Sequence, residues 1–354
     1  MAERGLLQVL ELETPVIQAP MGGGPSTPEL VAAVSNAGGL GSLAAAYLTP
    51  DQTIAAIRRV RALTARPFSV NLFAGGYSRD AQSDAGPMLS LLAEVHAGLG
   101  LAPPTLPELP PDPFPDQLAA VLEAQPPVFS FTFGIPDPGA IKALKARGIT
   151  LLGTATTVGE AVVLGDAGID GVIAQGAEAG AHRGTFSGTF EAAMVPTLAL
   201  VRGIRKATEL PVVASGGIMS GQEIAGALRQ GACAAALGTA FLACPESGAS
   251  EAHKRALLGA GRDKTVITRA FSGRPARGLV NAFIEKLAGR ENAILPYPLQ
   301  NALTRAMRAA AAKQGNSDFL SLWAGQGVGR IRAMPARDLV LRLAAETRAA
   351  LAAP

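Results

Sequence analysis

The stretch AQGAEAGAHRGTF (Ala174–Phe186) directly follows a short apolar run, GVIA (Gly171–Ala174). Such a run is typical of a buried strand, and its apolar character ends at Gln175. Three glycines then space out the polar residues that follow, His182 and Arg183 among them, without helical or alternating periodicity. Glycine permits positive φ and lets the backbone approach a ligand closely. The pattern predicts a strand that delivers a histidine into a glycine-lined loop, and a solvated surface loop is the alternative.

The same order of apolar run, turn and helical pattern recurs along most of the chain. The predicted strands cover residues 16–19, 40–46, 68–73, 128–133, 150–154, 171–174, 212–215 and 232–237. Strands that alternate with helices indicate a parallel sheet. Eight such units within about 240 residues favour a closed (β/α)8 TIM barrel over an open sheet.

Two regions depart from this rhythm. Residues 75–115 are rich in Pro, Gly and Asp, with one helical pattern near 88–98, and we interpret them as an insertion after the third strand. A lid over the site and a tolerated surface excursion both remain open for it. Residues 251–354 have a mostly helical pattern without strands. We therefore expect a barrel domain over residues 1–250 and a helical extension, 251–354, packed on it.

The composition restricts the class of protein. The chain has 354 residues, of which 48% are hydrophobic and 17% charged, so a large core is expected and overall disorder is not. Lys and Arg are scattered, which argues against nucleic-acid binding, and the apolar runs are too short for a membrane span. Cys233 and Cys244 have no metal-site spacing, and two cysteines without a secretory signal predict a reducing cytoplasm. A homodimer remains open.

Glycines, amides and a few other candidate binding residues cluster where the predicted strands end. The carboxyl ends of the strands form the face of a barrel that carries the active site. Glycines after the last two strands suit a phosphate group, because backbone N–H groups can bind the anion there. Asn71 and Gln175 carry amides that both donate and accept, as the edge of a flavin ring requires, although either could be a capping amide. Together these residues favour a phosphate-bearing cofactor, most simply a mononucleotide. They are Met21, Gly22, Asn71, Gly134, Gln175, Gly216, Gly217, Gly238 and Thr239.

Other chemistries are poorly supported. His96 lies in the insertion and His253 at the start of a polar helix, and we expect both to be solvated. No G-x-S-x-G elbow is present, so a hydrolase triad is not indicated. We predict no metal site, because Glu178 and His182 lack a third ligand. The glycines of residues 325–329 do not follow a strand, which argues against a dinucleotide fingerprint.

Several motifs resemble those of the FMN-dependent nitronate monooxygenases, once called 2-nitropropane dioxygenases, and of their bacterial class I in particular. They are QAPMGGGPSTPELVAAVSNAGGLGSLAA, FTFGIP, AQGAEAGAHRGTF, VVASGGI, ALGTAFL and SLWAGQG, and they span nearly the whole chain. The resemblance implies that His182 is the catalytic histidine. It also implies contacts to FMN from Asn71, Gln175, Gly180, Gly217, Ala236, Leu237, Gly238 and Thr239. The family usually has glycine where this chain has Ala181, whose added methyl group either narrows the approach to the flavin or points away from it.

The resemblance implies oxidation of alkyl nitronates, such as propionate 3-nitronate, by bound FMN and O2. The products are a carbonyl compound and nitrite, and no reduced nicotinamide is consumed. His182 could be a neutral base that removes the α-proton of a nitroalkane, or a donor or cation that holds the nitro oxygens. Only the second role is needed for a nitronate. Tyr297 is a candidate for lining the substrate pocket, whereas Arg183 is expected to face solvent.

Two alternatives remain open at this point. NAD(P)H-dependent FMN barrels, including quinone reductases and enoyl-carrier-protein reductases, share a similar histidine loop. The SLWAGQG motif argues against them. A non-catalytic flavin- or phosphate-binding protein is the second alternative, and in it His182 would have no chemical role.

Overall fold

The computed structural model describes residues 5–10, 12–77, 84–261 and 264–353. Eight parallel strands form one sheet in the order β1-β9-β8-β6-β5-β4-β3-β2. They are β1 Val16–Gln18, β2 Gly41–Ala44, β3 Phe68–Phe73, β4 Val128–Thr132, β5 Thr150–Ala155, β6 Gly171–Gln175, β8 Val212–Ser215 and β9 Ala234–Leu237. A parallel bridge between Ile17 and Leu40 joins the two ends of the sheet, with Leu40 N donating to Val16 O at 3.0 Å. The predicted TIM barrel is confirmed.

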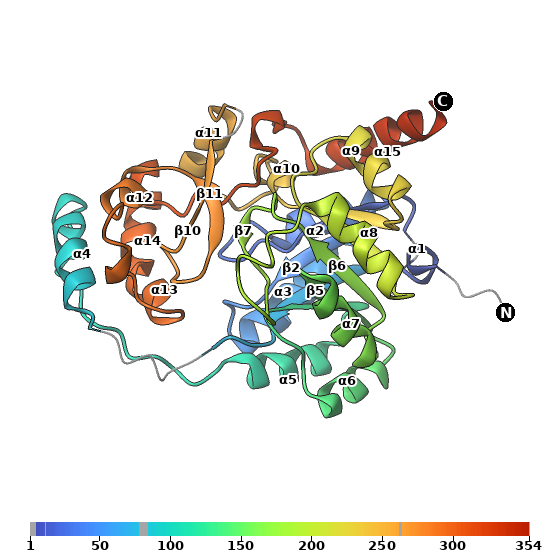
Figure 1. Ribbon diagram of the computed structural model, residues 1–354, viewed down its shortest axis with the longest axis horizontal. Helices are drawn as coiled ribbons and strands as arrows, with labels where there is room; N and C mark the ends of the chain where they lie inside the picture. The colour runs from blue at the N-terminus through green and yellow to red at the C-terminus, as the bar shows by residue number, and fades with distance from the viewer. Residues whose placement is uncertain (1–4, 11, 78–83, 262–263, 354) are drawn as a thin grey trace.

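Helices surround this barrel, and local capping residues start several of them (Figure 1). Thr157 and Glu160 form a capping box, in which each side chain binds the other residue's backbone N–H. The barrel helices are α2 Pro28–Asn36, α3 Pro50–Leu63, α5 Phe114–Ala124, α6 Pro138–Lys145, α7 Val158–Asp166, α8 Thr197–Ala207, α9 Gly221–Arg229 and the short α10 Thr239–Leu242. The last helix, α15 (Ala336–Ala352), returns to the barrel, where Glu346 accepts a hydrogen bond from Gly221 N at 2.9 Å. Within the described ranges, no helix combines the length and the apolar character needed to cross a membrane.

Apolar side chains fill the inside of the barrel. Ile17, Leu40, Leu152 and Ile173 belong to one buried cluster with residues of α1 (Leu6–Val9), which packs at the amino-terminal ends of the strands. The same four side chains form the floor of a cavity above them. The barrel is therefore closed at one end, and it presents a cavity at the carboxyl ends of its strands.

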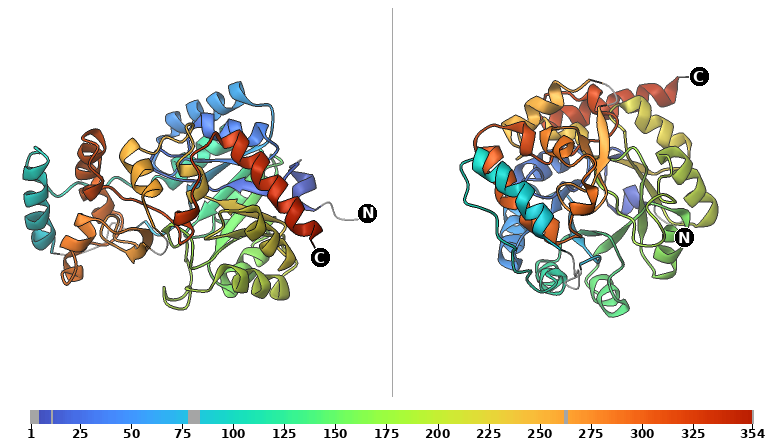
Figure 2. Two further views of the ribbon diagram at one scale, coloured as in Figure 1. Left: turned by 90° about the horizontal axis from the view of Figure 1, so that it is seen from above. Right: turned by 60° about the vertical axis from the view of Figure 1, so that its left-hand side comes forward.

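The insertion contributes helix α4 (Gly86–Gly98), which packs on the C-terminal region rather than on the barrel (Figures 1 and 2). Met88 and Leu92 of α4 share a buried cluster with Phe271, Phe283 and Leu303. We call the assembly of α4 with α12, α13 and α14 the cap. These three helices are α12 Ala282–Lys286, α13 Leu299–Leu303 and α14 Arg305–Lys313. Residues 78–83 of the predicted insertion lie outside the described residues.

A second sheet corrects the prediction that residues 251–354 contain no strands. Strand β11 (Ala276–Leu279) pairs antiparallel with β10 (Thr265–Thr268) on one side and with β7 (Ala181–His182) on the other. These strands are too short to show periodicity, and β11, with sequence ARGL, is buried throughout. The pairing partner β7 lies in the loop after β6, so only the tertiary fold joins them. His182 is consequently held in a sheet and not in a free loop.

Candidate active site

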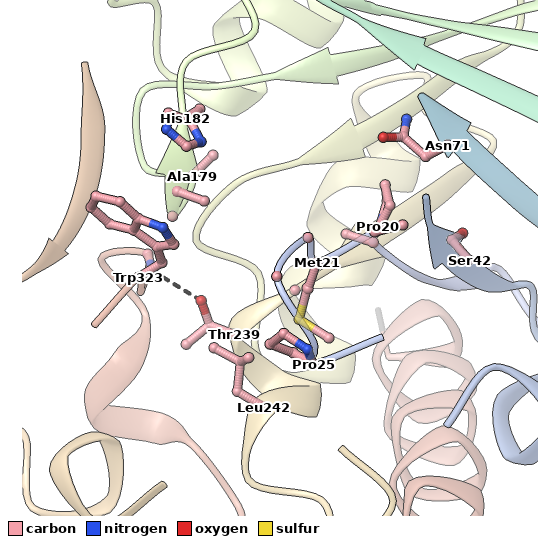
Figure 3. A pocket seen from close by; sticks show the side chains of 18 of the residues that line it. Pro20, Met21, Pro25, Ser42, Asn71, Ala179, His182, Thr239, Leu242 and Trp323 are labelled. Carbon is pink, nitrogen blue, oxygen red and sulfur yellow. Dashed lines mark hydrogen bonds between the residues drawn. The ribbon is translucent and has the colours of Figure 1, made fainter. Parts of the chain in front are cut away.

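One cavity of about 680 Å³ opens at the carboxyl ends of the barrel strands, and it gathers the residues that the sequence pointed to. His182 lies in its wall (Figure 3), whereas Gly134 is not among the described residues that line the cavity. The other predicted cofactor-binding residues all line it. These are Met21, Gly22, Asn71, Gln175, Gly180, Gly216, Gly217, Ala236, Leu237, Gly238 and Thr239. A cavity of this size and depth is typical of a small-molecule or cofactor site.

Amide and hydroxyl groups line one side of the cavity. Asn71 is only 3% exposed, and its Nδ2 donates to Ser130 Oγ at 3.0 Å, which leaves Oδ1 available to a ligand donor. Ser42 and Ser130 line the same side, and Ser42 N donates at 2.9 Å to Oε1 of Gln18, which is fully buried behind the lining. Gln18 carries no local signal that distinguishes it from any other strand residue. This side suits the polar edge of a planar heterocycle.

Glycine backbone lines the opposite side of the cavity. Gly216 and Gly217 have φ of 133° and 71°, which other residues rarely adopt. A Cβ at Gly217 would also lie 2.9 Å from Glu178 Cβ, so the Glu178 side chain occupies the space that another side chain would need. Gly238 and Thr239 follow at the end of the neighbouring strand β9. A phosphate group fits this cradle, because the glycines at the ends of β8 and β9 let it approach the backbone N–H groups.

Gln175 braces the histidine loop from within. Its Oε1 accepts from Gly184 N at 2.7 Å, and its Nε2 donates to His182 O at 2.9 Å. Ala181 adopts a φ of 61°, a left-handed conformation that costs an L-residue roughly 1–2 kcal/mol. This conformation explains why glycine suits the position, and Ala181 also lines the cavity.

Arg183 does not face solvent, contrary to the prediction. It is 4% exposed, and its guanidinium donates to Gly176 O at 2.6 Å, Gln175 O at 3.0 Å and Ala193 O at 2.8 Å. Burial, together with the nearby Arg277, lowers the pKa of Arg183 to about 10. The side chain remains charged at neutral pH, and its hydrogen bonds tie the end of β6 to the loop that contains Ala193.

His182 is neutral at neutral pH. Burial, together with the nearby charges of Arg274 and Arg308, lowers its pKa to about 3. Its Nε2 lies 2.8 Å from the oxygen of Ser272, a residue that is 1% exposed, and its ring packs against Trp323. Within the described ranges, no hydrogen bond involves its Nδ1, so this nitrogen is free to meet a substrate. Sequence analysis could not find Ser272, which carries no motif signal.

Three arginines surround the mouth of the cavity on the cap side. The Arg274 guanidinium lies 4.0 Å from the Phe133 ring centre, and Arg308 donates to Asn301 O at 2.8 Å. Arg305 and Arg308 line the cavity, and neither they nor Arg274 forms an ion pair with any other described residue. Such a mouth attracts anions.

Tyr297 is not among the described residues that line the cavity. Its ring centre lies 4.7 Å from the Arg274 guanidinium, and Tyr77 packs against its other edge. Tyr297 is therefore a support for Arg274, which the prediction of a direct pocket contact did not anticipate.

His96 and His253 are buried, at 4% and 8% exposure, so the prediction that both are solvated was wrong. His96 Nδ1 lies 2.7 Å from Ala102 O. His253 also lines the cavity, and burial lowers its pKa to about 4. The charged residues Glu251, Lys254 and Arg255 close to it in α11 (Glu251–Leu258) gave no local signal of this burial.

We expect acid to destabilise the fold partly through His253. Its pKa is about 4 in the folded chain and 6.5 when unperturbed, so between these values only the unfolded state binds the proton. The stabilisation is complete above pH 6.5 and is lost as the pH falls towards 4, which amounts to about 2 kcal/mol at pH 5. Urea denaturation of wild type and His253→Gln at pH 8 and pH 5 measures it. An equal loss of stability in both proteins would contradict the assignment.

Comparison with known proteins agrees with this geometry. The family model described as nitronate monooxygenase matches residues 4–346. The chain belongs to the nitronate monooxygenase family. It is 43% identical over 353 residues to a protein named nitronate monooxygenase from Paraburkholderia phytofirmans, covering 98% of this chain and 95% of that protein. It is 44% identical over 348 residues to the one from Pseudomonas aeruginosa, covering 96% and 98%.

Solved structures point to the same family and to a neighbouring one. A nitroalkane oxidase from Streptomyces ansochromogenes superposes with a TM-score of 0.90 at 45% identity, covering 98% of both chains. FabK from Thermotoga maritima superposes with a TM-score of 0.77 at 28% identity, covering 97% of this chain and 96% of FabK. The nitroalkane oxidase is thus more similar to this chain than FabK is, in both sequence and structure.

Proposed function

We propose that the chain is an FMN-dependent enzyme that oxidises alkyl nitronates with O2 to a carbonyl compound and nitrite. The observation that carries the proposal is the convergence of His182, the amide side and the glycine cradle on a single cavity. The family membership supports the flavin, and the cradle supports a cofactor that ends in one phosphate. When bound, the flavin supplies the electron acceptor and the group that reacts with O2.

Residues of the chain would bind the cofactor, attract the substrate and exchange a proton with it. Asn71 Oδ1 would accept a hydrogen bond from the flavin edge, and the backbone at Gly217 and Gly238 would bind the phosphate. Arg274 and Arg308 would attract the nitronate anion to the mouth of the cavity. His182 Nδ1 would meet the nitro group or the α-proton, with Ser272 holding the opposite ring nitrogen.

The low pKa of His182 restricts the roles that this residue can have in the reaction. A neutral imidazole cannot hold an anion by charge, so we assign that task to the arginines. The ring can donate or accept a proton at Nδ1, since either His182 or Ser272 can be the donor between them. An anion bound beside His182 would raise its pKa, because it favours the charged form of the ring.

An oxygen-uptake assay tests this function directly. Purified protein reconstituted with FMN is mixed aerobically with propionate 3-nitronate and without NADH, and we expect O2 consumption together with nitrite. The similarity to FabK makes an NAD(P)H-dependent reductase the second candidate. Rapid anaerobic bleaching of the flavin by NADH, with no nitronate-dependent O2 uptake, would favour that candidate and exclude ours.

A further inference from the structure

The segment 323–330, which includes the end of the SLWAGQG motif, closes the phosphate side of the cavity. Gly325 N donates to Thr239 Oγ at 2.9 Å (dashed in Figure 3), and Gln326 N donates to Glu178 O at 3.0 Å. The segment is thereby tied both to the turn after β9 and to the histidine loop. No sequence pattern assigned it a place in the site.

Glycines bring this segment into direct backbone contact with the cradle. A Cβ at Gly180 would lie 2.5 Å from Gly325 N, and a Cβ at Gly327 would lie 2.6 Å from Gly217 O. Gly180, Gly217 and Gly327 all line the cavity, and their N–H groups form no hydrogen bond with any residue that the structure describes. Three separate loops therefore offer unpaired donors to one place.

Arg330, on the 3-10 helix η3 (Val328–Arg330), contacts the glycine cradle from outside the cavity. Its guanidinium donates to Gly217 O at 3.2 Å and pairs with Glu223 Oε1 at 2.7 Å. Because the C=O and N–H of a trans peptide point in opposite directions, this bond turns the N–H of Ile218 away from Arg330. Ile218 itself lines the cavity.

The ion pair also has an electrostatic consequence. Glu223 lies beside the cradle, where its carboxylate accepts a hydrogen bond from Met219 N at 2.8 Å. Without Arg330 this carboxylate would be left without its ion-pair partner, and it would repel a phosphate at the cradle. Arg330 thus favours an anion there in two ways, by aiming a backbone donor and by neutralising Glu223.

We propose that Arg330 is a positioning residue for the phosphate of the flavin, so that it sets the preference of this chain for FMN over riboflavin. The proposal rests on the flavin site of the proposed function. It predicts that loss of Arg330 weakens binding of the phosphorylated ligand and leaves binding of the flavin ring unchanged.

Fluorescence titration of flavin-free protein with FMN and with riboflavin tests it. For Arg330→Gln we expect the Kd for FMN to rise about tenfold or more, the size expected for a lost charge-assisted interaction, and the Kd for riboflavin to change less than about twofold. Arg330→Lys keeps the charge and should lose less FMN affinity. The control, Arg332→Gln, removes a neighbouring arginine that pairs with Glu346 and should bind both flavins as wild type does.

The outcomes separate the two proposals. If both Arg330 variants weaken FMN and riboflavin equally, or weaken neither, while wild type prefers FMN, the role of Arg330 is refuted and the cofactor proposal stands. If wild type binds riboflavin as tightly as FMN, or binds neither, the phosphate cradle itself is refuted.

Discussion

The Gly217→Glu variant is expected to be purified without FMN and to stay empty when FMN is added. Gly217 has a φ of 71°, which a non-glycine residue adopts at a cost of order 1–3 kcal/mol. The new Cβ would lie 2.9 Å from Glu178 Cβ, and the new carboxylate would add a second negative charge beside Glu178. The new side chain would clash with a phosphate that now contacts the backbone, and its carboxylate would repel that phosphate.

Flavin absorbance per protein after dialysis against excess FMN measures this effect. Gly226→Glu is a matched control, because a Cβ at Gly226 meets nothing within 4 Å and Gly226 does not line the cavity. If Gly217→Glu does not fold, Gly217→Ala serves as the test variant. We expect Gly217→Ala to bind FMN more weakly than wild type does. Stoichiometric FMN in Gly217→Glu would mean that the phosphate site lies elsewhere.

The His182→Asn variant is expected to lose turnover of neutral nitroalkanes by about two to four orders of magnitude, the usual contribution of a positioned base. Asparagine retains a hydrogen-bond donor but cannot accept the α-proton near neutral pH. Oxidation of a preformed nitronate needs no base, so its kcat/KM should fall less than about tenfold. Because the pKa of His182 is about 3 before an anion binds, the kcat/KM of wild type should show no inflection from this residue between pH 5 and 9.

Steady-state kinetics with one nitroalkane and its own nitronate measure the difference, after FMN content has been matched. His96→Asn is the control, since His96 is also a buried histidine but does not line the cavity. A similar loss on both substrates would make His182 a holder of the nitro group and not a base. If His182→Asn oxidised both substrates at wild-type rates, His182 would have no role in the reaction.

Local patterns were enough to predict the barrel. The predicted strands 68–73 and 212–215 match β3 and β8, and the other strands differ by a few residues at their ends. Most strands are short, largely apolar runs bounded by glycine, proline or polar residues, and this information is contained in a few neighbouring residues. The positions of Asn71 and Gly217 at the mouth of the barrel follow from the same pattern, since in a parallel barrel all carboxyl ends share one face.

Long-range pairing was not predictable in this way. Strand β11 forms only because it meets β7 and β10, and its own four residues carry no strand signal. Arg183 and His253 were expected in solvent because a single polar residue in a loop or polar helix usually lies there. Their burial depends on carbonyls and side chains that other parts of the chain bring to them.

The sequence by itself determined the barrel and the face that carries the cavity, and it predicted that His182 lies there. The tertiary structure decided the protonation state and the hydrogen-bond partner of His182. Distant parts of the chain bring Ser272, Arg274 and Arg308 to this histidine, and these residues set its hydrogen bond and its pKa. It also decided that Arg330 supports Gly217, across 113 positions of sequence. Strand order and turns follow from short-range periodicity, whereas protonation and anion binding depend on charges and burial that only the folded chain assembles.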